Sequence, residues 1–188
     1  MVVTRVAIAG IGYAGETHAQ AIANLNQANV VAGACRTESK GRTFAGKFNC
    51  NWYDDIETMF DTSNPDILFV CTPSGRHLKP TLAAAERGID VLCDKPLETT
   101  IERINRMVAA ADKHGIRLAG VFQYRYDPLI RAIRLSVAAG WFGSLSVANA
   151  YVLWWRPDNY YEDNWKGTFR DGGGATLNQS LHAIDTIQ

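Results

Sequence analysis

The last part of the sequence contains residues whose types and spacing could move a proton. On a helix beginning near Ala175, Asn178, His182 and Asp185 are four and three residues apart and share one face. An imidazole titrates near neutral pH and can accept the proton of a hydroxyl group, whereas an amide can only orient its partner. A lone helical histidine is more often structural. We expect His182 and Asn178 to be catalytic only if other motifs place them beside a reacting group.

A glycine-rich turn near the N-terminus could hold phosphate groups. The segment AGIGYAGETH has the GxGxxG spacing and lies between an expected strand and an expected helix. Such glycines allow a tight turn, close approach of the backbone to a pyrophosphate and close packing of the helix, whose N-terminal amides face the phosphates. The alternatives are a structural turn or another nucleotide-like ligand such as S-adenosylmethionine. We expect a dinucleotide to contact Gly10, Ile11, Gly12, Tyr13, Ala14 and Gly15.

The end of the second expected strand indicates which dinucleotide binds. About 20 residues after the glycines, an NAD-preferring fold places a carboxylate against the ribose hydroxyls. This sequence has Cys35 there, and Arg36, Ser39 and Lys40 follow as groups that could bind a 2′-phosphate. The alternative is a solvated helix start with Thr37 as its N-cap. We therefore expect NADP, with NAD as the second possibility.

Lys95 is a second candidate for the reaction itself. It follows an expected strand, at the edge where open α/β sheets bind ligands, and Pro96 fixes the turn after it. A lysine held near a cationic nicotinamide ring would have a lowered pKa and could hydrogen-bond a reacting hydroxyl. The alternative is a solvated lysine at a strand end.

Alternating strands and helices must position these residues. Short apolar runs, typical of strands covered on both faces, occupy residues 6–10, 30–34, 66–72, 90–94 and 117–123. Helical patterns lie between them at 14–25, 38–48, 78–87 and 100–114, and Gly88 and Gly115 follow the last two as helix-ending glycines. This alternation predicts an α/β fold with a doubly wound parallel sheet.

The pattern changes after about Tyr126. We expect a helix through PLIRAIRLSVAAG, then SLSVANAYVLWW as one long strand, then an aromatic and glycine-rich loop. Residues 1–123 should form the dinucleotide-binding domain. Residues 124–188 should be the incomplete start of a second, α+β domain for substrate and oligomer contacts.

Composition argues against several other classes of protein. Lys plus Arg number 19 and Asp plus Glu number 19, so nothing indicates a nucleic-acid or anionic-membrane partner. No apolar run reaches the roughly 18 to 20 residues that span a bilayer, and the N-terminal stretch is unlike a signal peptide. The cysteines show neither CxxC nor zinc spacing. We expect a soluble cytoplasmic protein with reduced thiols and no metal site.

Three ordered motifs behind the glycine loop resemble the glucose-fructose oxidoreductase / inositol dehydrogenase / MocA family of NAD(P)-dependent sugar and cyclitol oxidoreductases. They are CTPSGRH, VLCDKPLETT and GGGATLNQSLHAID. In that family a TPxxxH segment lies along the cofactor, which implies Thr72, Pro73 and His77. The lysine of an EKP motif reaches between nicotinamide and substrate, which implies Lys95, with Asp94 in place of the usual glutamate.

The resemblance extends to the end of the chain. WWRPDNYYEDNWKGTF is similar to a subgroup whose W[RK]G segment touches the cofactor, which implies Trp165 and Lys166. The family's acid/base histidine matches His182, while Asn178 stands where aspartate is commoner. We also expect Gln123, at the end of the last expected strand, at the cofactor.

The family implies a Rossmann-type domain, a small sugar or polyol substrate and homo-oligomers for the full-length protein. Its members are considerably longer, so the chain is expected to be an N-terminal portion that lacks the sheet of the substrate domain. A non-catalytic NADP-binding fragment or sensor therefore stays open as an alternative. A methyltransferase shares the glycine loop, but neither DKP nor W[RK]G serves methyl transfer.

Overall fold

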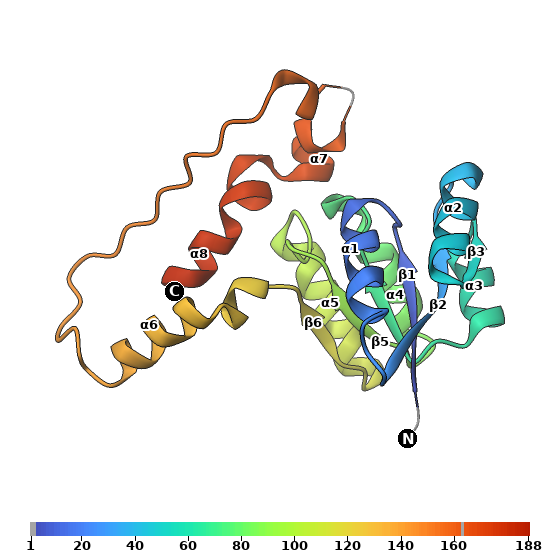
Figure 1. Ribbon diagram of the computed structural model, residues 1–188, viewed down its shortest axis with the longest axis horizontal. Helices are drawn as coiled ribbons and strands as arrows, with labels where there is room; N and C mark the ends of the chain where they lie inside the picture. The colour runs from blue at the N-terminus through green and yellow to red at the C-terminus, as the bar shows by residue number, and fades with distance from the viewer. Residues whose placement is uncertain (1–2, 163) are drawn as a thin grey trace.

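The computed structural model describes residues 3–162 and 164–188, and a parallel sheet forms its centre (Figure 1). Every strand pairing is parallel, and the strand order is β3-β2-β1-β4-β5-β6. The strands are β1 (Thr4–Ala9), β2 (Ala28–Ala34), β3 (Asn51–Tyr53), β4 (Ile67–Val70), β5 (Asp90–Cys93) and β6 (Leu118–Gly120). The helices that connect them are α1 (Tyr13–Ile22), α2 (Glu38–Phe48), α3 (Ile56–Ser63), α4 (Leu78–Ala85) and α5 (Ile101–His114). The predicted doubly wound α/β fold is confirmed.

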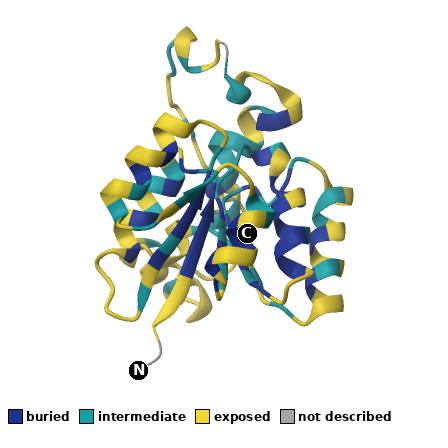
Figure 2. Ribbon diagram, turned by 90° about the vertical axis from the view of Figure 1, so that its right-hand side faces the viewer, coloured by how far each residue is buried: buried dark blue, intermediate teal, exposed yellow. Residues whose placement is uncertain are grey.

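Alternating residues of β1 pack into two separate cores, as expected when successive side chains point to opposite faces of a sheet. Val6 and Ile8 pack with buried residues of α1 and α2. Ala7 and Ala9 pack with residues of α3, α4 and α5, including Phe60. Figure 2 shows the buried strands between helices whose outer faces are exposed. Strand order reverses beside β1, and ligands of doubly wound sheets bind at the carboxyl ends of the strands there.

The structure adds one strand and one helix that the sequence patterns did not indicate. β3 has only three residues, too few for a clear alternation. α3 begins at the N-cap Asp55, whose side chain accepts a hydrogen bond from the Thr58 amide at 2.9 Å. Gly115 is the C-cap of α5 with a φ of 66°, as predicted. Gly88 also has a positive φ, 69°, but α4 ends earlier than predicted, at Ala85, and Gly88 lies in the turn after its C-cap Glu86.

The part of the chain that follows β6 leaves the sheet and returns to it in a wide loop (Figure 1). It contains η2 (Gln123–Tyr126), α6 (Pro128–Ala138), η3 (Asp158–Tyr160), η4 (Trp165–Gly167), α7 (Phe169–Gly172), the π-helical turn η5 (Thr176–Ser180) and α8 (Leu181–Ile187). The predicted long strand at 144–155 is wrong. Residues 144–157 are extended but pair with no strand in the part of the chain that the structure describes. An alternating apolar pattern forms a strand only where a neighbour supplies the hydrogen bonds.

Helix α7 attaches this returning segment to the parallel-sheet domain. It sits on η1 (Ser74–Arg76), the turn after β4. Arg76 donates to the nearly buried Asp171 carboxylate from Nε at 3.1 Å and from Nη2 at 2.6 Å. The contact requires a glycine, because a Cβ on Gly75 would lie 2.1 Å from the Arg170 carbonyl oxygen. η5 and α8 are thereby held at the carboxyl ends of the strands.

No helix among the described residues is long and apolar enough to cross a membrane.

Candidate functional site

In the glycine loop after β1, Gly10 and Gly15 are required by the fold, whereas Gly12 leaves space for a ligand. Gly10 has a φ of +92°, and a Cβ there would lie 2.6 Å from the backbone of Cys71 and Thr72. A Cβ on Gly15 would lie 2.2 Å from the Gly10 carbonyl oxygen. Gly12 instead faces open space and is the N-cap of α1 without a side-chain hydrogen bond. The open space beside Gly12 and the backbone amides at the start of α1 suit a pyrophosphate at the helix N-terminus.

This division predicts opposite effects for two alanine substitutions. Gly15→Ala should lower the free energy of unfolding by about 1 to 3 kcal/mol, because the new methyl group collides with backbone. Gly12→Ala should leave that free energy nearly unchanged but weaken dinucleotide binding by about tenfold or more, which is about 1.4 kcal/mol. Chemical denaturation and fluorescence titration measure the two quantities. Equal losses of stability in both variants would contradict the assignment.

His77 is buried beneath the carboxyl ends of the strands, where a cofactor is expected, and its side chain does not reach the surface there. Its side chain is only 1% exposed, and its ring nitrogens face two backbone carbonyls, Nε2 that of Thr72 at 2.7 Å and Nδ1 that of Pro96 at 2.9 Å. Direct contact of His77 with a cofactor stays a prediction, and this burial favours a supporting role instead. The ring joins the loop after β4, with Thr72 and Pro73, to the turn after β5, with Lys95.

Glu98, which the sequence analysis missed, braces the same turn. Its buried carboxylate accepts hydrogen bonds from Arg103 Nη2 at 2.7 Å and from the Thr99 amide at 2.8 Å. Arg103 also donates to the Gly75 carbonyl at 3.1 Å. Together with His77, this network fixes the turn that carries Lys95. Glu98 differs from the other glutamates by the burial of its carboxylate, which a sequence does not display.

The structure brings Lys95 against the segment that carries Asn178 and His182. Lys95 Nζ donates to the Asn178 backbone carbonyl at 2.5 Å. Burial lowers the pKa of Lys95, against the influence of Asp94, whose side chain accepts a hydrogen bond from the Lys95 amide at 2.9 Å. Burial also lowers the pKa of His182, and the charge of Lys95 lowers it further. At neutral pH His182 is therefore mainly in the form that can accept a proton.

Two polar atoms at this point have no partner among the described residues. They are Asn178 Nδ2 and His182 Nδ1, and both are buried. Buried polar groups are nearly always hydrogen-bonded, so unpaired ones indicate where a ligand or a water molecule binds.

The expected polar stripe of one α-helix is only partly correct. Residues 176–180 form a π-helical turn, and the α-helix begins at Leu181, which changes the angle between side chains on either side of the junction. Asp185 faces Arg125, which donates to it from Nε at 2.8 Å and from Nη2 at 2.5 Å. The Tyr124 ring stacks on His182 with centroids 4.8 Å apart, so η2 positions the histidine helix.

The remaining predicted cofactor residues lie in the segments that follow β2 and β6 and in η4. Arg36 and Lys40 are exposed after β2, and the Cys35 carbonyl accepts a hydrogen bond from Trp52 Nε1 at 3.1 Å. Thr37 is the N-cap of α2 but makes no side-chain cap hydrogen bond. Gln123 begins η2, and Trp165 and Lys166 begin η4. Contact of these residues with a cofactor stays a prediction.

Comparison with known proteins matches both parts of the chain to family models. Residues 4–122 match the oxidoreductase family with NAD-binding Rossmann fold, and residues 130–188 match the GFO/IDH/MocA C-terminal domain. D-glucoside 3-dehydrogenase of Escherichia coli K12 is 32% identical over 96% of this chain and 52% of its own length. Inositol 2-dehydrogenase 4 of Saccharopolyspora erythraea is 35% identical over 74% of this chain and 42% of its own.

Two solved structures share the fold of this chain. The WlbA dehydrogenase from Bordetella pertussis, in complex with NADH and UDP-GlcNAcA, superimposes with a TM-score of 0.96 and 28% identity over 100% of this chain and 57% of its own. The corresponding enzyme from Chromobacterium violaceum gives a TM-score of 0.95 at 27% identity over 98% of this chain and 54% of its own. The chain thus spans about half the length of the relatives that it matches.

Proposed function

Because the chain belongs to the Gfo/Idh/MocA family of oxidoreductases, with their NAD-binding Rossmann domain, we propose that it serves hydride transfer between a nicotinamide dinucleotide and a sugar or cyclic polyol. The carbon that reacts carries a hydroxyl or carbonyl group. The observation that carries this proposal is the contact between Lys95 and Asn178. This contact supports the proposal because it joins the lysine after β5 to the π-helical turn that precedes α8, the helix with His182.

The residues present suit such a cofactor. Gly12 leaves space at the N-terminus of α1, and Thr72 and Pro73 follow β4 at the same edge of the sheet. When bound, the nicotinamide ring supplies the acceptor or donor of the hydride. The protein contributes proton transfer and orientation.

Lys95 and His182 divide these tasks. His182, neutral because burial and Lys95 lower its pKa, accepts the hydroxyl proton during oxidation and returns it during reduction. Lys95 donates a hydrogen bond to the reacting oxygen and stabilises negative charge that develops there. Asn178 anchors the lysine through its backbone carbonyl, and its buried side-chain amide is free to hydrogen-bond substrate.

A coupled assay tests this function directly. The purified full-length protein is incubated with NADP⁺ or NAD⁺ and a panel of sugars and cyclic polyols, and absorbance of the reduced cofactor is followed. Dinucleotide binding without turnover of any member of the panel would favour a non-catalytic dinucleotide-binding protein instead.

We further propose that NADP is preferred to NAD. Arg36, after β2, and Lys40, in the first turn of α2, are both exposed, and no carboxylate stands at the position of Cys35. Arg36→Ala should weaken NADPH binding by about 10- to 100-fold, the loss of one charge-assisted hydrogen bond, and change NADH binding little. Fluorescence titration measures both affinities.

The matched control for Arg36 is Arg42→Ala on α2, the helix that begins two residues after Arg36. Arg42 already pairs with Glu38, its Nε lying 2.8 Å from Oε1, so its loss should leave NADPH affinity nearly unchanged. Equal affinities of the unmutated protein for NADPH and NADH would refute the preference.

A further inference from the structure

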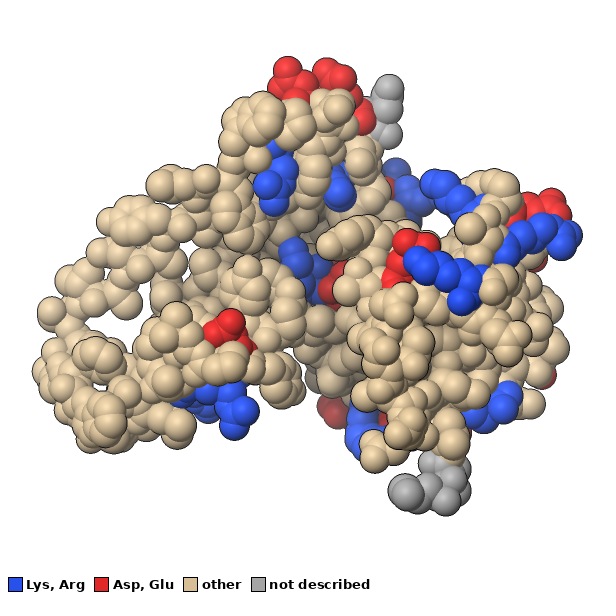
Figure 3. Space-filling model, viewed as in Figure 1, with Lys and Arg blue, Asp and Glu red and all other residues tan. Residues whose placement is uncertain are grey.

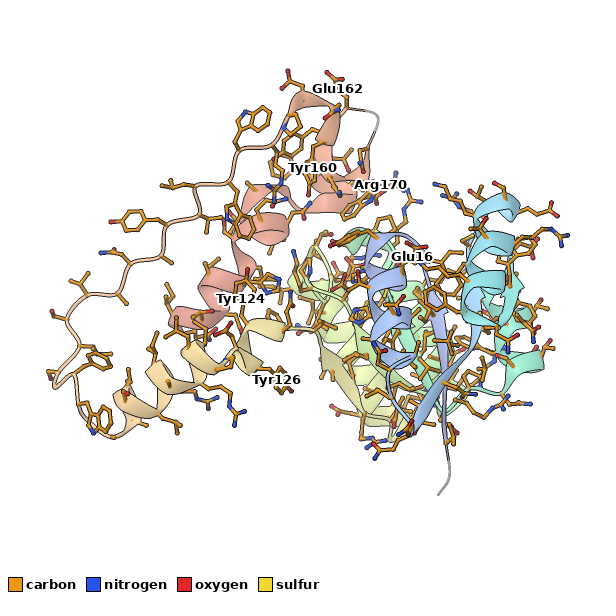
Figure 4. The ribbon with its side chains drawn as sticks, viewed as in Figure 1. Glu16, Tyr124, Tyr126, Tyr160, Glu162 and Arg170 are labelled. Carbon is orange, nitrogen blue, oxygen red and sulfur yellow. The ribbon has the colours of Figure 1, made fainter. Side chains whose placement is uncertain are left out.

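A cluster of cations surrounds one phenol ring beside the proposed catalytic residues. Lys166 Nζ lies 4.0 Å from the centroid of the Tyr160 ring, and the guanidinium carbon of Arg156 lies 5.4 Å from it. Gln179 Nε2 lies 2.8 Å from the Tyr160 hydroxyl oxygen. Arg156 Nη2 in turn donates to Gln179 Oε1 at 3.4 Å. Figure 4 shows Tyr160 on the returning segment, above the histidine helix.

The cluster is directly linked to the contact between Lys95 and Asn178. Gln179 directly follows Asn178, so adjacent residues of the π-helical turn hold Lys95 and Tyr160. Burial is the main reason for the lowered pKa of Lys95, but the charges of Tyr160 and Lys166 also act on it. The direct geometric link between the cluster and Lys95 is the π-helical turn, through Asn178 and Gln179.

The cations of the cluster have no carboxylate partner within residues 3–162 and 164–188. Arg76, Arg103 and Arg125 each pair with an acidic side chain, whereas no described ion pair includes Arg156, Lys166 or Lys95. Figure 3 shows basic side chains below the acidic tip of this part of the chain. Neighbouring like charges repel one another, and an anion bound between them removes that cost.

We propose that Arg156 and Lys166 form an anion subsite, and that the sugar on which Lys95 and His182 act carries a carboxylate or phosphate group that binds there. The proposal rests on the proposed function, because it names the class of its substrate. A guanidinium can hold either group through two parallel hydrogen bonds, and an ammonium adds a point charge.

The surroundings of the two cations favour this role over simple surface packing. The Tyr160 ring and Gln179 restrict the guanidinium of Arg156 before any ligand arrives, which lowers the entropy lost on binding. The buried Asn178 amide nitrogen, which has no described partner, is a further unpaired donor on the residue next to Gln179.

Binding of three probes to the full-length, dinucleotide-loaded protein tests the subsite. The probes are a hexuronate, a hexose 6-phosphate and the corresponding neutral hexose, measured by calorimetry at low and high salt. We expect at least one anionic probe to bind about ten- to a hundredfold more tightly than the neutral hexose, with an advantage that decreases as salt rises. The arm that binds more tightly shows whether the group is a carboxylate or a phosphate.

Variants identify the residues responsible. The double variant Arg156→Gln/Lys166→Gln should bind the anionic probe no more tightly than the neutral hexose. Arg156→Lys alone, which keeps a positive charge, should retain part of the preference for the anionic probe. The matched control is Arg134→Gln on the exposed face of α6, which removes one positive charge elsewhere and should change nothing. Unfolding temperature and dinucleotide affinity show whether each variant is folded.

Three results would overturn the proposal. They are equal binding of anionic and neutral probes by the unmutated protein, no binding of any probe despite dinucleotide binding, and an unchanged advantage in the double variant. If Lys166→Gln weakened only dinucleotide binding, the cation would serve the cofactor, as the W[RK]G resemblance implies. An anionic probe that binds but is never oxidised would contradict the proposed function and leave the subsite intact.

Discussion

His182→Asn in the full-length protein is expected to lower kcat by about 10²- to 10⁴-fold, the usual contribution of a general acid/base, and to leave dinucleotide affinity nearly unchanged. Asparagine keeps a polar group of similar reach but cannot accept the hydroxyl proton. Steady-state kinetics measure kcat, and fluorescence titration measures cofactor binding.

The pH dependence of oxidation provides an independent check on His182. Burial and Lys95 lower its pKa below the ordinary value of 6.5, so the neutral base persists under mildly acidic conditions. The oxidation rate should therefore stay high down to about pH 6.5 and fall only as pH drops through the lowered pKa. His114→Asn, at the exposed end of α5, is the matched control. Full turnover by His182→Asn would remove the histidine from the mechanism.

Lys95→Met is expected to lower kcat by about 10²- to 10⁴-fold as well, because the reacting oxygen loses its charged hydrogen-bond donor. Methionine retains much of the apolar stem, so the turn after β5 should stay folded. The substitution should also raise the pKa of His182, since the positive charge of Lys95 lowers it in the unmutated protein.

NMR titration of the imidazole carbons measures this second effect without any turnover. The His182 signals are assigned from the His182→Asn variant. Lys79→Met, an exposed substitution on α4, controls for the loss of one positive charge. A His182 pKa that is unchanged or lower in Lys95→Met would show that the two groups do not interact.

The parts of the site that the sequence predicted depend on short-range sterics and on strand ends. GxGxxG encodes a turn in which Gly10 and Gly15 are required by backbone atoms only a few residues away or on the adjacent loop. Lys95 could be placed because the carboxyl end of a buried parallel strand is recognisable from its apolar run. These features need no knowledge of the second domain.

The errors concern contacts between distant parts of the chain. Asp185 is bound by Arg125, which is 60 residues away, and His77 is bound by the backbone of the next strand's turn. Neither partner can be inferred from local spacing. Alternating apolar residues at 144–155 have the pattern of a strand, yet pairing depends on a neighbour that periodicity does not reveal. The contacts of Tyr160 with Gln179 and Lys166 could not be predicted for the same reason.

The extended segment 144–157 acts as a tether. His182 reaches Lys95 through noncovalent contacts at both ends of the returning segment, α7 on η1 and α8 on η2, and the tether itself makes no strand pairing there. Its contribution is therefore the effective concentration of one half of the site near the other. Because loop-closure entropy grows only logarithmically, doubling such a loop costs about 0.6 kcal/mol. A longer tether would therefore cost little free energy, provided that Arg156 near its end keeps its contacts with Tyr160 and Gln179.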